Sequence, residues 1–102
     1  MREVSQPATE AIRMVEVLRA LADPVRLEIV RQLAGAEPGE LMCHQLELPV
    51  TKSTASHHLK TLLHAGVTAE REAGTCKYIR LRRDELEQEL PGLLESVLRA
   101  PA

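Results

Sequence analysis

The sequence predicts a mainly α-helical domain that carries one β-hairpin, with elements in the order α-α-α-α-β-β-α. Apolar residues recur at helical spacing through roughly the first two thirds of the chain. The spacing becomes strand-like after Gly66 and returns to helical near the C-terminus. With 102 residues, 44% of them apolar and only one aromatic, the chain fits a single domain, 1–102, with an aliphatic core.

The first two helices are predicted by their apolar spacing and by the residues between them. Apolar positions three and four apart predict an amphipathic helix over about residues 9–22. Asp23 and Pro24 then begin a second helix, because an aspartate N-cap accepts from free backbone N–H groups and a proline at the first position has no N–H to leave unpaired. Gly35 ends this helix.

Two further helices are predicted over residues 40–48 and 51–64, joined by a short turn. A turn at residues 37–39, which contain proline and glycine, precedes the first of them. Thr51 is the expected N-cap of the second, and Gly66 is the expected end. Leucine and alanine side chains are expected on its inner side, which leaves polar and basic side chains on its outer side.

A β-hairpin is expected to follow, with strands over residues 67–72 and 75–81. Gly74 is available for the positive φ that a tight turn between them requires. Asp84 is expected to cap a last helical region, which is interrupted by a Pro-Gly pair. A leucine-rich stripe over about residues 91–100 forms the end of this region.

The net charge of −2 hides a strong segregation of charge along the chain. Residues 1–50 carry a net charge of −3 and residues 84–102 a net charge of −4. Residues 51–83 between them carry seven basic and two acidic side chains, a net charge of +5. Such a concentration of cations is typical of a surface that faces phosphates.

Two helices joined by a short turn, the second with a polar and basic outer face, form the helix-turn-helix pattern. Small hydroxyl side chains let such a helix approach base edges in the major groove, and a basic hairpin, or wing, contacts phosphates. The sequence therefore predicts a winged helix-turn-helix that binds double-stranded DNA. The expected contact residues are Thr51, Lys52, Ser53, Thr54, Ser56, His57 and Lys60 on the helix and Arg71, Lys77 and Arg80 on the wing.

Three strings are distinctive: LADPVRLEIVRQL at 21–33, TKSTASHHLKTL at 51–62 and AGV at 65–67. They resemble the corresponding parts of the ArsR-type winged-helix repressors of bacteria, and the likeness covers nearly the whole chain. The resemblance implies a homodimer formed through the terminal helices, about 9–22 and 91–100. It also implies an operator DNA of two-fold symmetry, and repression relieved by a metal, redox or other small signal.

Cys43 and His44 are the candidate metal ligands, since thiolate and imidazole together suit zinc or a softer metal. The metal-sensing members of the family carry two cysteines with one residue between them at this place, so a single cysteine leaves the site incomplete. Cys43 and Cys76 are the candidates for a redox switch. The favoured interpretation is that both are structural thiols and that the protein has no cofactor; the inducing signal stays open.

Other classes of protein are disfavoured by what the sequence lacks. It has no Gly-rich phosphate loop and no convincing catalytic cluster, so an enzyme is not expected. It has no apolar run of the roughly 20 residues needed to cross a bilayer, which predicts a cytoplasmic protein without a membrane partner.

The alternative to DNA binding is a winged helix that binds an acidic protein partner through the same basic face. The hydroxyl-rich helix start favours DNA, because protein interfaces favour aromatic residues and Tyr78 is the single aromatic.

Overall fold

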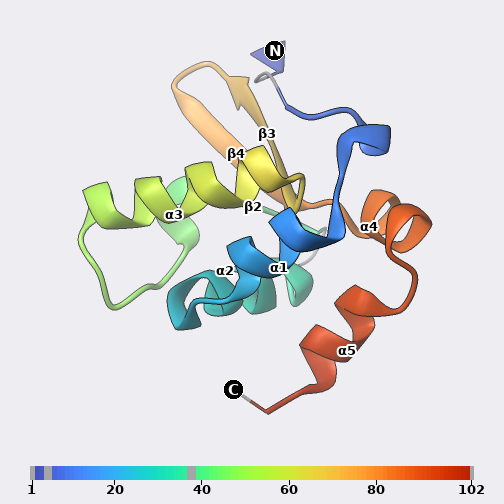
Figure 1. The fold of residues 1–102 in the computed structure, drawn as a ribbon. Coiled ribbons are helices and arrows are strands. Elements are labelled where there is room, and N and C mark those ends of the chain that lie inside the picture. The colour runs from blue at the N-terminus through green and yellow to red at the C-terminus, as the bar shows by residue number, and fades with distance from the viewer. Residues whose placement is uncertain (1, 4–5, 37–38, 102) are drawn as a thin grey trace.

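The computed structural model describes residues 2–3, 6–36 and 39–101. Three helices pack together beside an antiparallel sheet, two short helices follow at the C-terminal end, and a long hairpin extends beyond the third helix (Figure 1). The helices and strands are β1 (Arg2–Glu3), α1 (Met14–Leu21), α2 (Pro24–Ala34), β2 (Glu40–Met42), α3 (Lys52–Ala65), β3 (Thr68–Ala73), β4 (Cys76–Leu81), α4 (Arg83–Glu89) and α5 (Leu93–Arg99), with single 3-10 turns η1 (Thr9–Ala11) and η2 (Cys43–Gln45). This mainly helical architecture with a hairpin wing confirms the predicted fold class.

The sheet has the strand order β1-β3-β4-β2, and every neighbouring pair is antiparallel. The hairpin runs in register from Thr68 opposite Leu81 to Ala73 opposite Cys76. Gly74 lies in the connecting turn with φ +64°, as a tight turn between two strands requires. The predicted hairpin is therefore confirmed, within one residue at each strand end.

The core lies between the helices and the inner face of the sheet. The largest fully buried side chains are Val17, Ile29, Val30, Leu33, Leu62, Val67, Thr68 and Ile79. All but Thr68 are apolar, and each contributes roughly 1.5–3 kcal/mol by leaving water. Because α1, α2, α3 and both hairpin strands supply these residues, burial of one core fixes the helices relative to the wing.

Two of the three predicted N-caps, Asp23 and Thr51, are confirmed. Asp23 Oδ1 accepts from the backbone N–H groups of Val25 and Arg26 at 2.8 and 3.1 Å. These bonds, of which the one from Arg26 has the larger effect, hold the pKa of Asp23 below its usual value. Thr51 Oγ1 accepts from the backbone N–H of Thr54 at 3.2 Å, which fixes where α3 begins.

The first predicted helix, over residues 9–22, is wrong in its N-terminal half. Its first residues form the η1 turn, the backbone is extended at Ile12 and Arg13, and α1 begins only at Met14. The extended backbone lets the Ile12 side chain enter the core, where it is 3% exposed. It packs beside Gly66, whose φ is +86° and where an added Cβ would lie 2.7 Å from Ile12 Cγ1.

The third predicted helix, over residues 40–48, is also wrong. Its first three residues form β2, which pairs with β4 so that Leu41 lies opposite Ile79 and Met42 opposite Tyr78, and only the single turn η2 follows. The backbone groups of this segment are thus bonded to another strand instead of to one another. The expected turn at residues 37–39 lies partly outside the described residues.

The C-terminal region is interrupted at Pro91 and Gly92, as predicted, and Gly92 has φ +82°. The expected cap is wrong: Arg82 occupies the N-cap of α4, and Asp84 lies inside the first turn. An aspartate there still favours the helix, because the N-terminal end of the helix dipole attracts negative charge.

Candidate nucleic-acid interface

The outer face of α3 is polar, basic and open to solvent. Its exposed side chains are Lys52, Ser53, Thr54, Ser56, His57, Lys60 and His64. Leu59, Leu62 and Leu63 are buried on the opposite side, as the helical spacing predicts. Among the described residues, no carboxylate lies within ion-pair distance of Lys52 or Lys60. The face therefore presents cations and hydroxyl groups without an internal counter-charge.

Side chains of α2 hold α3 and the segment before it in place. The Gln32 amide accepts from the backbone N–H of Glu47 at 3.0 Å and donates to the Glu47 carbonyl at 2.8 Å. Arg26 Nη1 lies 3.1 Å from Nδ1 of His58, while Arg26 Nε donates to the Ala20 carbonyl. His58 is accordingly half-buried and His57 exposed, so the two neighbouring histidines do not share one site.

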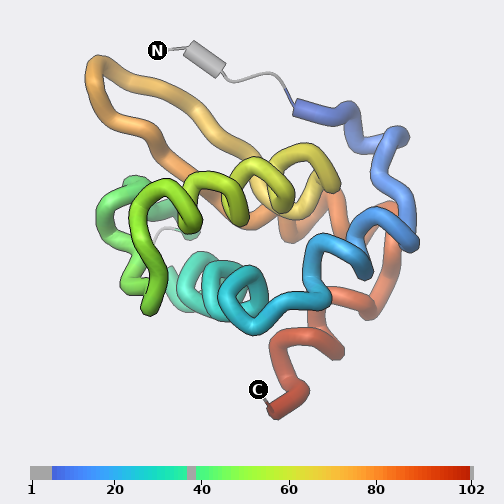
Figure 2. The backbone as a smooth tube through the Cα atoms, turned by 60° about the vertical axis from the view of Figure 1, so that its left-hand side comes forward, coloured from blue at the N-terminus to red at the C-terminus, as the bar shows by residue number. Residues whose placement is uncertain are grey.

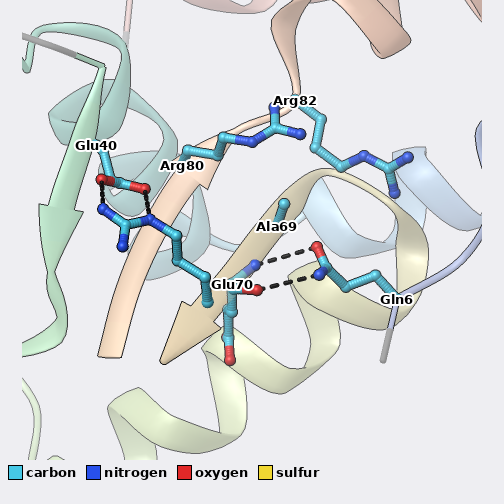
Figure 3. A pocket seen from close by; sticks show the side chains of 7 residues that line it. Gln6, Glu40, Ala69, Glu70, Arg80 and Arg82 are labelled. Carbon is cyan, nitrogen blue, oxygen red and sulfur yellow. Dashed lines mark hydrogen bonds and ion pairs between the residues drawn. The ribbon is translucent and has the colours of Figure 1, made fainter. Parts of the chain in front are cut away.

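Arg71 lies on the face of the sheet that points away from α3. Successive residues of a strand point to opposite faces, and Ile79 of β4 is buried on the α3 side, so Tyr78 and its partner Arg71 face the other way. Arg71 donates to both Glu40 oxygens, Nε at 2.9 Å and Nη2 at 2.6 Å (Figure 3). Its guanidinium also lies 4.3 Å from the centre of the Tyr78 ring.

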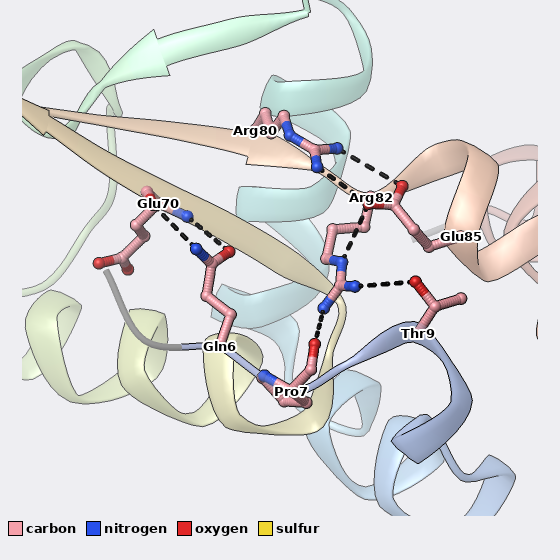
Figure 4. Close-up of polar contacts among 7 residues, drawn as sticks. All are labelled: Gln6, Pro7, Thr9, Glu70, Arg80, Arg82 and Glu85. Carbon is pink, nitrogen blue, oxygen red and sulfur yellow. Dashed lines mark hydrogen bonds and ion pairs between the residues drawn. The ribbon is translucent and has the colours of Figure 1, made fainter. Parts of the chain in front are cut away.

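Arg80 and Arg82 share one carboxylate, that of Glu85. The closest distances to Glu85 Oε2 are 2.9 Å from Arg80 and 3.2 Å from Arg82 (Figure 4). These bonds, of which the one from Arg80 has the larger effect, lower the pKa of Glu85 to about 2. Arg82 also donates to the Pro7 carbonyl at 2.8 Å and to the Thr9 hydroxyl at 3.4 Å, which ties the N-terminal segment to the end of the sheet.

Lys77 is the wing cation on the α3 side of the sheet. Its Nζ lies 3.6 Å from Glu70 Oε1, and its side chain is 42% exposed. Lys77 lines one surface hollow together with Ser56 and Lys60 of α3. The structure thus brings Lys77 together with the predicted helix residues, whereas Arg71 and Arg80 line a different hollow with Glu40 and Gln6.

The basic stretch of residues 51–83 is therefore divided between two surfaces. The carboxylates that pair with its arginines, Glu40 and Glu85, come from outside that stretch, so a count along the chain does not find them. Sequence reasoning also missed the contact between Arg26 and His58, which lie 32 residues apart. No local signal points to these partners, because strand pairing and helix packing create them.

The two cysteines, Cys43 and Cys76, are free thiols, both half-buried, and both line a cavity between η2, α3 and the wing. His44 lines the same cavity. Within residues 2–3, 6–36 and 39–101, no group of three or more His, Cys, Asp or Glu side chains is placed to hold a metal ion.

Comparison with known proteins identifies the class of this fold. A family model described as a helix-turn-helix domain matches residues 21–71, half of the chain. The Bacillus subtilis helix-turn-helix-type transcriptional regulator YceK is 40% identical over 84 residues, which cover 80% of this chain and 83% of that protein. The arsenical resistance operon repressor of the same species is 35% identical over 98 residues, 93% of this chain and 88% of the repressor. This chain belongs to the ArsR-type transcriptional regulators. The resemblance stated from the sequence strings is thereby confirmed.

A third relative comes from another organism. A helix-turn-helix-type transcriptional regulator of Methanocaldococcus jannaschii is 32% identical over 78 residues, which cover 74% of this chain and 85% of that protein. These relatives are named as transcriptional regulators, not as enzymes. In the described part of this ArsR-type chain, every helix is too short or too polar to span a bilayer.

Proposed function

We propose that this regulator is a dimeric repressor, acting in the cytoplasm, that binds a two-fold symmetric operator and releases it in response to a small signal. The observation that carries the proposal is the outer face of α3, where exposed hydroxyl groups accompany two lysines that pair with no carboxylate in the described part of the chain. A helix with such a face fits a major groove about 12 Å wide. Residues 1–102 act in this proposal as one DNA-binding domain.

The DNA-contacting residues divide by the part of DNA they touch. Base contacts come from the first turns of α3, and phosphate contacts come from the helix start and from the wing. Arg71 and Arg80 hold their carboxylates at 2.6 and 2.9 Å, closer than the 3.6 Å between Lys77 and Glu70, so they contribute less to phosphate binding than Lys77 does. The proposed set is Thr51, Lys52, Ser53, Thr54, Ser56, His57, Lys60, Arg71, Lys77 and Arg80.

The dimer contact is proposed to involve α1 and α5. Met14, Val15 and Leu18 of α1 are 45%, 57% and 46% exposed, which is unusual for large apolar side chains so close in sequence. On α5, Val97 and Leu98 are half-buried against the core. A two-fold axis through this region buries the same patch twice and presents two α3 helices to grooves roughly 34 Å apart.

Direct binding tests the DNA proposal. The full chain is titrated into labelled DNA from upstream of its own gene and into a shuffled duplex, each at 50 and 200 mM salt. The expected result is tighter binding to the upstream DNA and a steep fall in affinity with salt on both. The proposal would be contradicted if every part of the upstream DNA bound with the same affinity as the shuffled duplex, or if neither duplex bound at low salt.

Light scattering during gel filtration tests the dimer. The wild type is expected to elute with twice the chain mass at micromolar concentration, and Leu18→Glu to shift it toward the monomer. Glu16→Gln on the same helix is the control, since Glu16 lies outside the exposed apolar set. A monomeric wild type would contradict the dimer while leaving DNA binding to be decided by the titration.

A further inference from the structure

A cavity of about 550 Å³ lies where η2, the first turns of α3 and the wing meet. Its apolar lining comes from Leu46, Leu48, Val50, Ala55 and Leu59. Volumes of 300–1,000 Å³ with mostly apolar walls and a few polar groups are typical of small-ligand sites. Figure 2 shows the three elements that form it on the same side of the molecule, with α1 and α5, the helices of the proposed dimer contact, elsewhere.

Two cations, Lys52 of α3 and Lys77 of β4, also line this cavity. Lys52 has no carboxylate within ion-pair distance among the described residues, and Lys77 has only the 3.6 Å contact with Glu70. The same two lysines stand in the proposed DNA-contacting set, as does Ser56, which lines the cavity as well. Apolar walls with two cations favour a ligand that has an apolar body and one negative group.

We infer that this cavity binds a small amphipathic organic anion, such as a medium-chain carboxylate, and that the bound anion competes with DNA for Lys52 and Lys77. The apolar body lies against the leucines, and the anionic group accepts from the lysine ammonium groups. Both a ligand anion and a DNA phosphate need the same donors, so the two exclude one another. The competition rests on the proposed function, whereas the cavity and its ligand class do not.

The ligand is tested on the full chain with anilinonaphthalene sulfonate as fluorescent probe, displaced by decanoate or by uncharged decanol. Decanoate is expected to displace the probe at a concentration about tenfold lower than decanol, because only decanoate engages the lysines. The double variant Lys52→Gln/Lys77→Gln is expected to remove that difference. Lys60→Gln, which removes the same type of charge outside the cavity lining, is expected to retain it. Equal displacement by decanoate and decanol in the wild type would overturn the ligand class.

The position of the ligand is tested in two ways: by a substitution that fills the cavity, and by the rate at which the two cysteines that line the cavity are modified. Ala55→Phe places a ring among the lining residues and is expected to abolish decanoate binding, while Gln88→Phe on the exposed side of α4 leaves it intact. In the wild type, which needs no folding control, decanoate is expected to slow modification of Cys43 and Cys76 by a thiol reagent. Unchanged binding by a folded Ala55→Phe variant, or thiol rates that decanoate does not alter, would overturn the site.

The coupling is tested by adding decanoate to the protein–DNA complex. Decanoate is expected to lower DNA affinity in the wild type and to have no effect in Ala55→Phe. Simultaneous binding of decanoate and DNA would overturn the competition. A chain that binds no DNA would instead contradict the proposed function, and the fluorescence titration would still decide whether the cavity holds the anion.

Discussion

The outer face of α3 and the outer face of the sheet carry cations from the same basic stretch of sequence, yet the two faces differ in how those cations are paired. On α3, Lys52 and Lys60 have no counter-charge among the described residues. On the sheet, Arg71 is paired with Glu40, and Arg80 is paired with Glu85. Sequence charge alone therefore overstates the attraction that the sheet exerts on a phosphate.

This difference separates affinity from stability. A solvated, unpaired lysine adds little to the folded state, so its removal is expected to affect only a bound anion. A paired and partly buried arginine leaves a carboxylate without its partner when it is removed, so its removal is expected to affect folding first. Substitutions on the two faces measure whether this division holds.

The largest effect is expected for Arg82→Ala. Arg82 is 6% exposed, and its loss leaves the Pro7 carbonyl without its donor and the Glu85 carboxylate with Arg80 alone. We expect the free energy of unfolding to fall by about 3–5 kcal/mol, as measured by urea unfolding. Arg83→Ala, at the exposed neighbour, is the control and is expected to cost less than about 1 kcal/mol. Equal losses for the two variants would contradict the structural role of Arg82.

The next effect is a pH dependence carried by Glu85, whose folded-state pKa of about 2 lies below its ordinary value of 4.5. Its stabilising contribution is fully present above pH 4.5 and is lost as the pH falls toward 2. We expect Glu85→Gln to be less stable than wild type by on the order of 2–3 kcal/mol at neutral pH. The two stabilities should converge between about pH 5 and 2 in urea titrations.

Glu89→Gln provides the control for that titration. The Glu89 carboxylate makes no ion pair among the described residues, so its substitution removes a carboxylate without breaking such a contact and is expected to change stability by less than about 1 kcal/mol. A gap between wild type and Glu85→Gln that does not change with pH would contradict the assignment of the pKa shift to the Arg80 and Arg82 contacts.

The features that the sequence predicted correctly depend on residues close together in the chain. Asp23 and Thr51 cap helices through backbone groups two or three residues away. Gly74 supplies the positive φ within its own turn, and the inward leucines of α3 repeat at helical spacing. The predicted outer face of α3 follows from the same spacing, so the helical part of the candidate site was within reach of sequence reasoning.

The features it missed depend on partners far along the chain. The apolar residues of 40–48 are compatible with a short helix or a strand. Because Leu41 pairs with Ile79 of β4, the start of this segment forms a strand. The break at Ile12 likewise depends on the space beside Gly66. The pairing of Arg71 with Glu40, 31 residues away, follows only once β2 lies beside β4. Tertiary contacts therefore explain why the third element is a strand instead of the predicted helix, and why an arginine of the wing is paired with a carboxylate.

Lys52→Ala tests the α3 side of the comparison. We expect a loss of about 1–3 kcal/mol in the free energy of binding to upstream DNA, measured by fluorescence anisotropy, because the variant loses a cation that pairs with no carboxylate among the described residues. Its free energy of unfolding is expected to stay within about 0.5 kcal/mol of wild type, since the side chain is exposed. A larger loss of stability than of affinity would reverse the role given to this face.

The smallest effect is expected for Arg71→Ala, which tests the sheet side with the same loss of one charge. The part-exposed pair with Glu40 and the contact with the Tyr78 ring together contribute about 1 kcal/mol to stability. DNA affinity of the folded variant is expected to fall less than in Lys52→Ala, because the guanidinium is already paired. If Arg71→Ala instead binds DNA as weakly as Lys52→Ala, the guanidinium must exchange Glu40 for phosphate. The free carboxylate would then repel DNA, so Glu40→Gln would bind more tightly than wild type and distinguish exchange from simple proximity.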